Sequence, residues 1–209
     1  MTNTKPSIDI QAGLRYLSDV DSDMAEVIQR LGPPASRSRP GGFSALLKIL
    51  VGQQVSTASA LAIWGRLSAT GMVKPDVILA GTEEDLRALG LSRPKARYAH
   101  ALATASVEGR LDLDSLPGLA DEDAHAHLCA MLGIGPWTAE IYLLCCLDRA
   151  DTLPAGDLAL QEAARALKHR ELRPKPIELI EIAEPWRPWR GVAALVLWRY
   201  YRELVGREA

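Results

Sequence analysis

The sequence predicts an all-α protein. Apolar residues recur at helical spacing in almost every segment, and no stretch alternates apolar and polar residues as a strand would. Short connections rich in Gly, Pro and Ser separate these segments. With 209 residues, 48% of them hydrophobic, the chain can bury a full core. We expect roughly ten or eleven helices in one two-lobed domain, with lobe one near residues 43–150 and lobe two near residues 1–42 plus 151–209.

Two helices and a loop are predicted at the beginning of the chain. Leu14, Leu17 and Val20 share one helical face, and the helix that follows ends at Gly32, since the two prolines after it cannot continue a helix. Residues 33–42 are rich in Pro, Ser, Arg and Gly. They predict a loop that leads into the main body.

A polar turn lies between two apolar helices. Residues 43–51 have a helical apolar pattern, and Ser56 fits the N-cap of the next helix. The turn between them is Gly52-Gln53-Gln54. The two glutamines are either exposed turn residues or side chains that contact a ligand, and the pattern alone favours neither.

Three further helices are predicted before residue 110. A short helix covers residues 75–80, and Thr82 with Asp85 forms a capping box for the next one, which ends at Gly90. A longer helix then runs to Val107. Residues 111–119 are expected to be a linker.

A glycine hairpin is predicted after the helix that contains Leu128. The two glycines of Gly133-Ile134-Gly135 allow a tight turn, and Pro136 fits the first turn of the following helix. A helix start has unpaired N–H donors and the positive end of the helix dipole. This stretch can therefore bind an anion such as a phosphate.

A single acid, Asp157, stands at the start of the next predicted helix, which runs to Leu167. It is either an N-cap or a functional carboxylate, and the pattern alone favours the cap. A short helix over residues 177–183 and a final helix over residues 192–204 follow.

Composition excludes several classes of protein. No apolar run reaches the roughly 20 residues that span a bilayer, and residues 1–6 lack the apolar segment of a signal peptide, so we expect a cytoplasmic protein. Cys129, Cys145 and Cys146 have neither the number nor the spacing of a disulfide framework or a zinc or iron–sulfur site. Buried thiols are expected instead.

Charge does not by itself indicate a nucleic-acid-binding protein. The net charge is −2, from 24 basic and 26 acidic residues, whereas such domains usually have a basic excess. Basic residues do cluster within residues 168–175 and 187–202. These clusters are either solvated helix ends or a local basic face.

Five motifs, in this order, resemble the helix-hairpin-helix DNA glycosylase superfamily, and within it the alkylpurine branch of the DNA-3-methyladenine glycosylase II type. They are Gly52-Gln53-Gln54-Val55-Ser56, Gly90-Leu91-Ser92-Arg93 with Lys95-Ala96, Gly133-Ile134-Gly135-Pro136-Trp137-Thr138-Ala139, Leu153-Pro154 with Asp157, and Trp186-Arg187-Pro188-Trp189-Arg190. The resemblance covers about residues 43–201. It implies a helix-hairpin-helix motif, a Gly/Pro loop with an essential Asp, and an active-site cleft between the lobes.

The resemblance implies a base excision repair enzyme that hydrolyses the N-glycosidic bond of alkylated purines such as 3-methyladenine and 7-methylguanine. Asp157 aligns with the essential acid, which would stabilise the sugar cation and orient water. A cationic alkylated base leaves as a neutral molecule, so no general acid is required. Related lyases have a Lys where this chain has Trp137, so we expect no lyase activity.

The resemblance also implies a pocket for a base flipped out of the duplex. Trp137 and Trp198 match its aromatic walls, which would attract a cationic ring, although a core role is the alternative for Trp198. Ile141 and Leu158 stand where family pockets can have a tyrosine.

The implied DNA contacts lie on the turn and the hairpin. Gln54 takes the position of the side chain that fills the gap left by the flipped base, with Gln53 beside it. The amides of Gly133, Gly135 and Thr138 would hold phosphates, which would let a chain of charge −2 bind DNA.

No organic cofactor and no side-chain metal site are expected, but the resemblance implies a structural Na⁺ or K⁺ ion on the carbonyls of Cys129, Met131 and Ile134. The expected partner is double-stranded DNA with alkylated bases, bound by a monomer away from any membrane and associated with the nucleoid in a bacterium. A non-catalytic helix-hairpin-helix DNA-binding module and a glycosylase for another damaged base are the alternatives. Asp157 together with Trp137 favours an enzyme, because a binding module needs neither.

Overall fold

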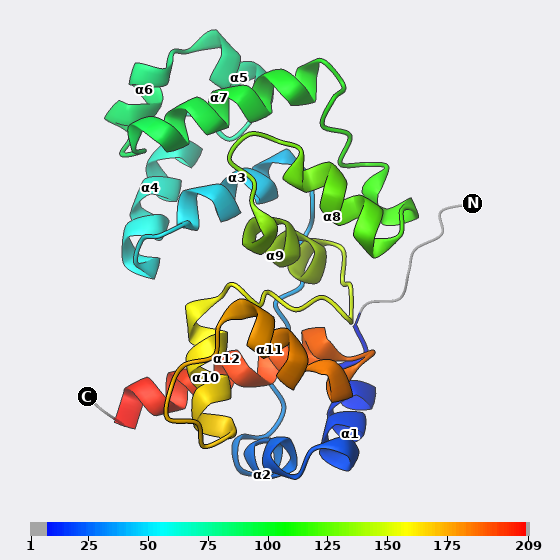
Figure 1. The fold of residues 1–209 in the computed structure, drawn as a ribbon. Coiled ribbons are helices and arrows are strands. Elements are labelled where there is room, and N and C mark those ends of the chain that lie inside the picture. Colours follow the sequence, from blue (N-terminus) through cyan, green and yellow to red (C-terminus); the bar gives the residue numbers. More distant parts are fainter. Residues whose placement is uncertain (1–7, 208–209) are drawn as a thin grey trace. The chain divides into compact units, whose positions relative to one another are not determined.

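The computed structural model describes residues 8–207, which form α-helices and short 3₁₀ helices and contain no strand (Figure 1). The all-α prediction is confirmed. The signal-peptide prediction concerned residues 1–6, which lie outside the described residues. The helices are α1 (Ile10–Val20), α2 (Ser22–Leu31), α3 (Phe43–Gly52), α4 (Thr57–Ala69), α5 (Pro75–Ala80), α6 (Glu83–Ala88), α7 (Arg93–Val107), η1 (Leu116–Gly118), α8 (Asp121–Cys129), α9 (Pro136–Cys146), α10 (Leu158–Leu167), α11 (Pro176–Ile182), η2 (Glu184–Trp186) and α12 (Arg190–Arg207).

Local side-chain chemistry sets several helix boundaries. Ser56 caps α4 by accepting the Ser59 N–H at 3.2 Å. Thr82 and Asp85 form the predicted capping box of α6. Pro136 is the first residue of α9, where its missing N–H costs nothing. These three sequence predictions are confirmed.

One expected linker is partly helical. The stretch over residues 111–119 contains the 3₁₀ helix η1, whose Leu116 is fully buried. This 3₁₀ helix is only three residues long. A repeat of apolar residues at helical spacing cannot be recognised over so few residues, so the sequence pattern did not predict it.

The described chain divides into two compact units. Unit 1 covers residues 39–142, and unit 2 combines residues 8–38 with residues 143–207. The sequence pattern predicts lobe boundaries after residues 42 and 150, and in the structure the two units meet in sequence after residues 38 and 142. We describe each unit by itself.

Unit 1 is organised around α7, which packs against α3, α5 and α6 (Figure 1). Leu46, Leu50 and Leu102 are almost wholly buried where these helices meet. The same long helix reaches both the turn after α3 and the glycine hairpin, as the contacts below show.

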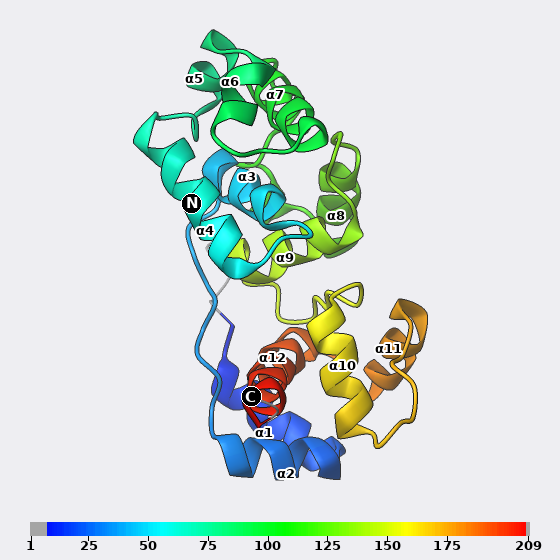
Figure 2. The same ribbon diagram turned by 90° about the vertical axis from the view of Figure 1, so that its left-hand side faces the viewer.

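Unit 2 is organised around α12, which packs against α10, α1 and α2 (Figure 2). Its first turns are buried on all sides, since Val192, Leu197 and Trp198 are each no more than 6% exposed. Gly13 of α1 lies so close to α12 that a Cβ there would stand 2.6 Å from a methyl group of Val192. In the described part of the chain, no helix combines the length and apolar character that a membrane crossing requires.

Asp21 ties three elements of unit 2 together. Its carboxylate caps α2 by accepting the Asp23 and Met24 N–H groups, and it also accepts the Lys168 ammonium at 2.7 Å and the Trp186 indole N–H at 2.7 Å. The Asp21 side chain is only 8% exposed. Burial raises the pKa of Asp21, but these hydrogen bonds outweigh that effect and hold its pKa below the usual range.

We predict that Asp21→Asn lowers the free energy of unfolding by about 2 kcal/mol at pH 7, because it weakens charge-assisted bonds but keeps a good N-cap residue. A lowered pKa in the folded state stabilises the protein above the unfolded pKa, and this stabilisation is lost as the pH falls through the folded pKa. Urea unfolding between pH 7 and pH 3 measures both effects.

The exposed Asp19 supplies the control, since Asp19→Asn should change stability by less than about 0.5 kcal/mol. If Asp21→Asn retains the acid dependence of the wild type, another group is responsible for it.

Candidate functional site

The residues predicted to form the site fall in both units. Unit 1 contains the turn with Gln53 and Gln54, the hairpin, Trp137 and Ile141. Unit 2 contains Asp157, Leu158 and Trp198.

The hairpin depends on a close contact between Gly133 and Tyr98 of α7. Gly133 has φ +86°, a left-handed conformation that glycine adopts without strain. A Cβ at Gly133 would also stand 2.4 Å from Cγ of the Tyr98 ring. This position therefore requires glycine for two independent reasons. Gly135, by contrast, is exposed, and a Cβ there would meet open space.

The start of α9 is the place where the sequence predicts an anion site. Pro136 begins the helix, and the Gly135 carbonyl accepts the Ala139 N–H at 3.1 Å. The N–H groups of a first helical turn have no partner within the helix. The exposed Gly135 leaves room for an anion to approach these donors.

Gln53 links the turn after α3 to the hairpin. Its side-chain nitrogen donates to the Gly133 carbonyl at 3.1 Å and to the Thr138 hydroxyl at 2.8 Å. The Thr138 side chain is buried, at 2% exposure. The Gln53 amide nitrogen is thus engaged inside unit 1, and a DNA contact by this residue stays a prediction. Gln54 is exposed and has φ +52°.

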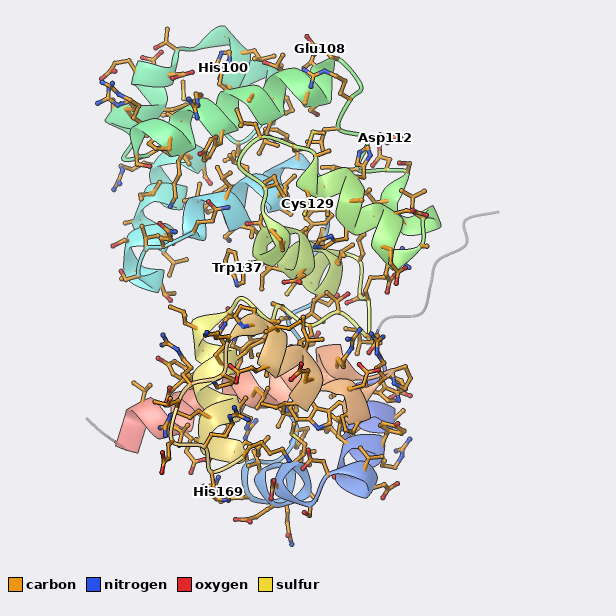
Figure 3. All side chains as sticks on the ribbon, viewed as in Figure 1. His100, Glu108, Asp112, Cys129, Trp137 and His169 are labelled. Atoms are coloured by element: carbon orange, nitrogen blue, oxygen red, sulfur yellow. The ribbon has the colours of Figure 1, made fainter. Side chains whose placement is uncertain are left out.

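Trp137 and Ile141 are one helical turn apart on α9. Trp137 lies in the first turn of the helix and is half-buried (Figure 3). Ile141, four residues later, is 8% exposed and lies on the same face. This face offers an aromatic ring beside an aliphatic wall.

Asp157 is the N-cap of α10, so that interpretation of the residue is confirmed. Its Oδ1 accepts the Ala159 N–H at 2.9 Å and the Leu160 N–H at 3.2 Å. The side chain is half-buried. A cap of this kind fixes the orientation of a carboxylate and leaves open whether it also has a chemical role.

The loop before Asp157 is held at several points that the sequence pattern does not reveal. The buried Gln161 donates to the Ala155 carbonyl at 2.8 Å. Asp151 accepts the Arg190 guanidinium at 2.8 Å and Arg187 at 2.6 Å. These bonds anchor the loop to α10 and to the start of α12.

Gly191 also brings this loop and α12 together. Its N–H donates to the Ala150 carbonyl at 2.7 Å, and a Cβ at Gly191 would stand 2.7 Å from the same oxygen. The backbone of α12 therefore approaches the loop more closely than any side chain would permit.

The other two pocket candidates of unit 2 differ from each other. Leu158 is 61% exposed, directly after Asp157. Trp198 is only 6% exposed, and the guanidinium of Arg37 lies 4.4 Å from the centre of its ring. The ring therefore already binds a cation from within its own unit. Its burial agrees with the core interpretation, and its pocket role stays a prediction.

Much of the basic C-terminal segment is engaged within unit 2. Lys168 pairs with Asp21 and Asp23, and Arg170 with Glu178. Arg199 donates to the carbonyls of Leu31 and Pro33. These side chains brace the fold, which weakens the case for a dedicated basic face.

The three cysteines are thiols, but only Cys145 is buried, whereas Cys129 and Cys146 are half-buried, so the expectation of buried thiols holds for Cys145 alone. Burial raises the pKa of Cys129, and the charge of Glu140 adds to this effect. Cys129 lies at the end of α8 (Figure 3). Within residues 8–207, no group of three or more His, Cys, Asp or Glu side chains is arranged to hold a metal ion.

Known proteins share both the sequence pattern and the fold. Residues 47–188 match the HhH-GPD superfamily of base excision DNA repair proteins. The chain is 32% identical over 168 residues to the Bacillus subtilis protein YfjP, covering 75% of this chain and 58% of that one. It is 28% identical to a DNA-3-methyladenine glycosylase of the same organism, covering 77% of this chain and 57% of the relative. The chain thus spans a little over half the length of these two relatives.

The chain is also similar to solved structures, including the following two. The Schizosaccharomyces pombe 3-methyladenine DNA glycosylase Mag1, in complex with abasic DNA, has 26% identity and a TM-score of 0.84 over 90% of this chain and 95% of that one. A DNA-3-methyladenine glycosidase from Bacillus halodurans has 30% identity and a TM-score of 0.80 over 93% and 91%.

We predict that Gly133→Ala lowers the free energy of unfolding by about 3 kcal/mol, because the new methyl group combines backbone strain with overlap on Tyr98. Gly135→Ala is the matched control and should change it by less than about 0.5 kcal/mol. Thermal unfolding followed by circular dichroism measures both. Equal effects of the two variants would contradict the close contact with Tyr98.

Proposed function

This chain belongs to the HhH-GPD superfamily of base excision DNA repair proteins, and from that premise we propose that it is a monofunctional DNA glycosylase for alkylated purines. The observation that carries the proposal is Asp157, a carboxylate oriented by two backbone N–H groups at the end of an anchored Gly/Pro loop. The exposed Gly135 at the start of α9 and the similarity to proteins named 3-methyladenine glycosylase or glycosidase support it.

Asp157 would act on the sugar. Cleavage of the N-glycosidic bond places positive charge on the deoxyribose, and a fixed carboxylate beside it lowers the energy of that state. The same oxygen atoms can orient the water that completes hydrolysis. The hydrogen bonds to Ala159 and Leu160 keep the carboxylate from rotating away. The capping and catalytic roles of this residue are therefore compatible.

Unit 1 would hold the DNA and the flipped base. The amides of Gly133, Gly135 and Thr138 would bind phosphates, and Gln54 would fill the gap in the duplex. Trp137 would stack on the base, since an aromatic face attracts the cationic ring of 3-methyladenine or 7-methylguanine. Such a base leaves as a neutral molecule, so one carboxylate is enough for the chemistry.

Several finer points belong to the same proposal. Trp137 stands where related lyases have a nucleophilic Lys, so we expect hydrolysis without strand cleavage. Ile141, Leu158 and Trp198 stay the further candidates for contact with the flipped base. We expect a monomer acting on double-stranded DNA in the cytoplasm, at the nucleoid of a bacterial cell, and no organic cofactor.

A structural Na⁺ or K⁺ ion on the carbonyls of Cys129, Met131 and Ile134 is also proposed. The Met131 carbonyl accepts the Ile134 N–H at 3.1 Å, which leaves its second lone pair for an ion. The Cys129 carbonyl lies in the last turn of α8, where carbonyls lack partners within the helix. Bound there, the ion would stiffen the hairpin and add positive charge beside a phosphate.

We predict that replacing K⁺ and Na⁺ by tetramethylammonium at constant ionic strength weakens DNA binding severalfold, because the larger ion cannot enter a ring of carbonyls. Fluorescence anisotropy with a labelled duplex measures the affinity. An unchanged affinity would contradict the ion site, with no consequence for the role of Asp157.

We predict that Asp157→Asn reduces release of 3-methyladenine and 7-methylguanine from methylated DNA by at least about 100-fold. Asn is also a good N-cap, so the fold and DNA binding should persist. Chromatography of the released bases and anisotropy with intact DNA separate the two effects. Asp9→Asn is the matched control, because Asp9 caps α1 in the same way through the Ala12 N–H.

The alternatives give different results in the same experiment. A non-catalytic DNA-binding module would bind DNA and release no base, even as wild type. A glycosylase for another lesion would release a deaminated or oxidised base but no alkylated one. Full activity of Asp157→Asn would remove this residue from the mechanism, and a borohydride-trapped adduct would contradict hydrolysis without lyase activity.

A further inference from the structure

Lys95 holds the turn that presents Gln54, although the proposed chemistry does not use it. Its ammonium donates to the Val51 carbonyl at 2.8 Å and to the Gln53 carbonyl at 2.5 Å. These two oxygens flank the end of α3, immediately before Gln54. Burial lowers the pKa of Lys95, in keeping with an ammonium withdrawn from solvent.

The position of Lys95 is unfavourable within its own helix. It is the third residue of α7, where the helix dipole repels a positive charge. Its two partners lie at the C-terminal end of α3, where the dipole of that helix attracts one. The Lys95 ammonium is thus stabilised by α3 and destabilised by the dipole of α7. Formation of α7 alone would not favour a positively charged residue at this position.

Gln54 has a strained backbone that its neighbours maintain. A non-glycine residue at φ +52° costs on the order of 1 kcal/mol. Lys95 holds the carbonyl directly before Gln54, and the Ser56 cap fixes the start of α4 two residues after it. The Gln54 side chain is exposed. Strain of this kind persists only where contacts on both sides impose it.

The same helix face also holds the hairpin. Tyr98 lies three residues after Lys95 on α7, on the same side of the helix, and its ring packs against Gly133. Gln53 closes the arrangement by donating to Gly133 and Thr138. The Gln54 turn and the phosphate-binding hairpin are therefore fixed relative to each other by α7.

We infer that Lys95 is a positioning residue that sets where Gln54 stands relative to the hairpin, so that this side chain enters the duplex at a fixed distance from the bound phosphates. The inference rests on the proposed function, in which Gln54 fills the gap left by the flipped base. Lys95 touches neither DNA nor the reacting atoms. It acts through Gln54.

Lys95→Met tests this inference, because Met keeps the length of the side chain and removes its donors. Two readouts are used with the full chain: binding to a duplex with a tetrahydrofuran abasic analogue relative to an intact duplex, and base release in single turnover. Loss of two hydrogen bonds should reduce both the preference for the abasic duplex and the rate of base release roughly tenfold. Affinity for the intact duplex should stay within about twofold, since the hairpin amides are unaffected.

Two further variants separate positioning from general stability. Lys95→Arg keeps donors at this position and should restore most of the loss, whereas Lys74→Met, at an exposed lysine of the same unit, should behave as wild type. In a Gln54→Ala background, Lys95→Met should have no further effect, because the side chain through which it acts is gone. Independent, multiplying effects of the two substitutions would overturn the inference.

The abasic-duplex readout requires no catalysis, so the inference and the proposed function can fail separately. If the wild type prefers the abasic duplex and Lys95→Met loses that preference, the inference stands even when no base is released. If the wild type releases base and Lys95→Met retains the preference for the abasic duplex, the inference fails and the function stands. A wild type without that preference would also overturn the inference.

Discussion

Unit 1 has two short turns that bear its predicted DNA contacts, and both depend on the first two turns of α7. Lys95 binds the carbonyls before one turn, and Tyr98 packs against Gly133 of the other. Gln53 then joins the two turns directly. A short exposed turn has too few contacts of its own to keep a strained conformation. The helix α7 supplies the additional contacts. Binding residues on loops generally depend on a rigid element of this kind to hold them in position.

In unit 2, contacts from neighbouring helices likewise hold the loop that carries the Asp157 carboxylate. The loop before Asp157 has a few backbone hydrogen bonds of its own, and Gln161, Arg190 and Gly191 add others to its backbone from two helices. Asp157 stands at the end of this loop and begins α10. The N–H groups that a helix must satisfy at its start therefore also orient the acid. Capping of the helix and orientation of this carboxylate are therefore achieved by the same two hydrogen bonds.

The sequence predicted the features that depend on nearby residues. The caps at Ser56, Thr82 and Asp157 and the proline at the start of α9 are local, because each forms within three or four residues. Many contacts that hold the site join distant residues: Lys95 and Gln53 are 42 positions apart, and Gln53 and Thr138 are 85 positions apart. Such distant pairs leave no periodic pattern in a single sequence. The Lys95-Ala96 motif can be recognised in the sequence, but the carbonyl groups of Val51 and Gln53 that Lys95 binds cannot.

Net charge and binding chemistry are connected through these internal contacts. Arg187 and Arg190 form salt bridges with Asp151, and Lys168 forms one with Asp21. These basic side chains thus stabilise loops and helices of unit 2. These three cations are therefore held by carboxylates of unit 2 and not by a phosphate backbone. The first backbone N–H groups of a helix have no partner within that helix, so an exposed helix start without a capping side chain can offer them to an anion. Under the proposed function, phosphate binding would therefore depend on the backbone of the exposed glycine hairpin, which Tyr98 of α7 contacts at Gly133.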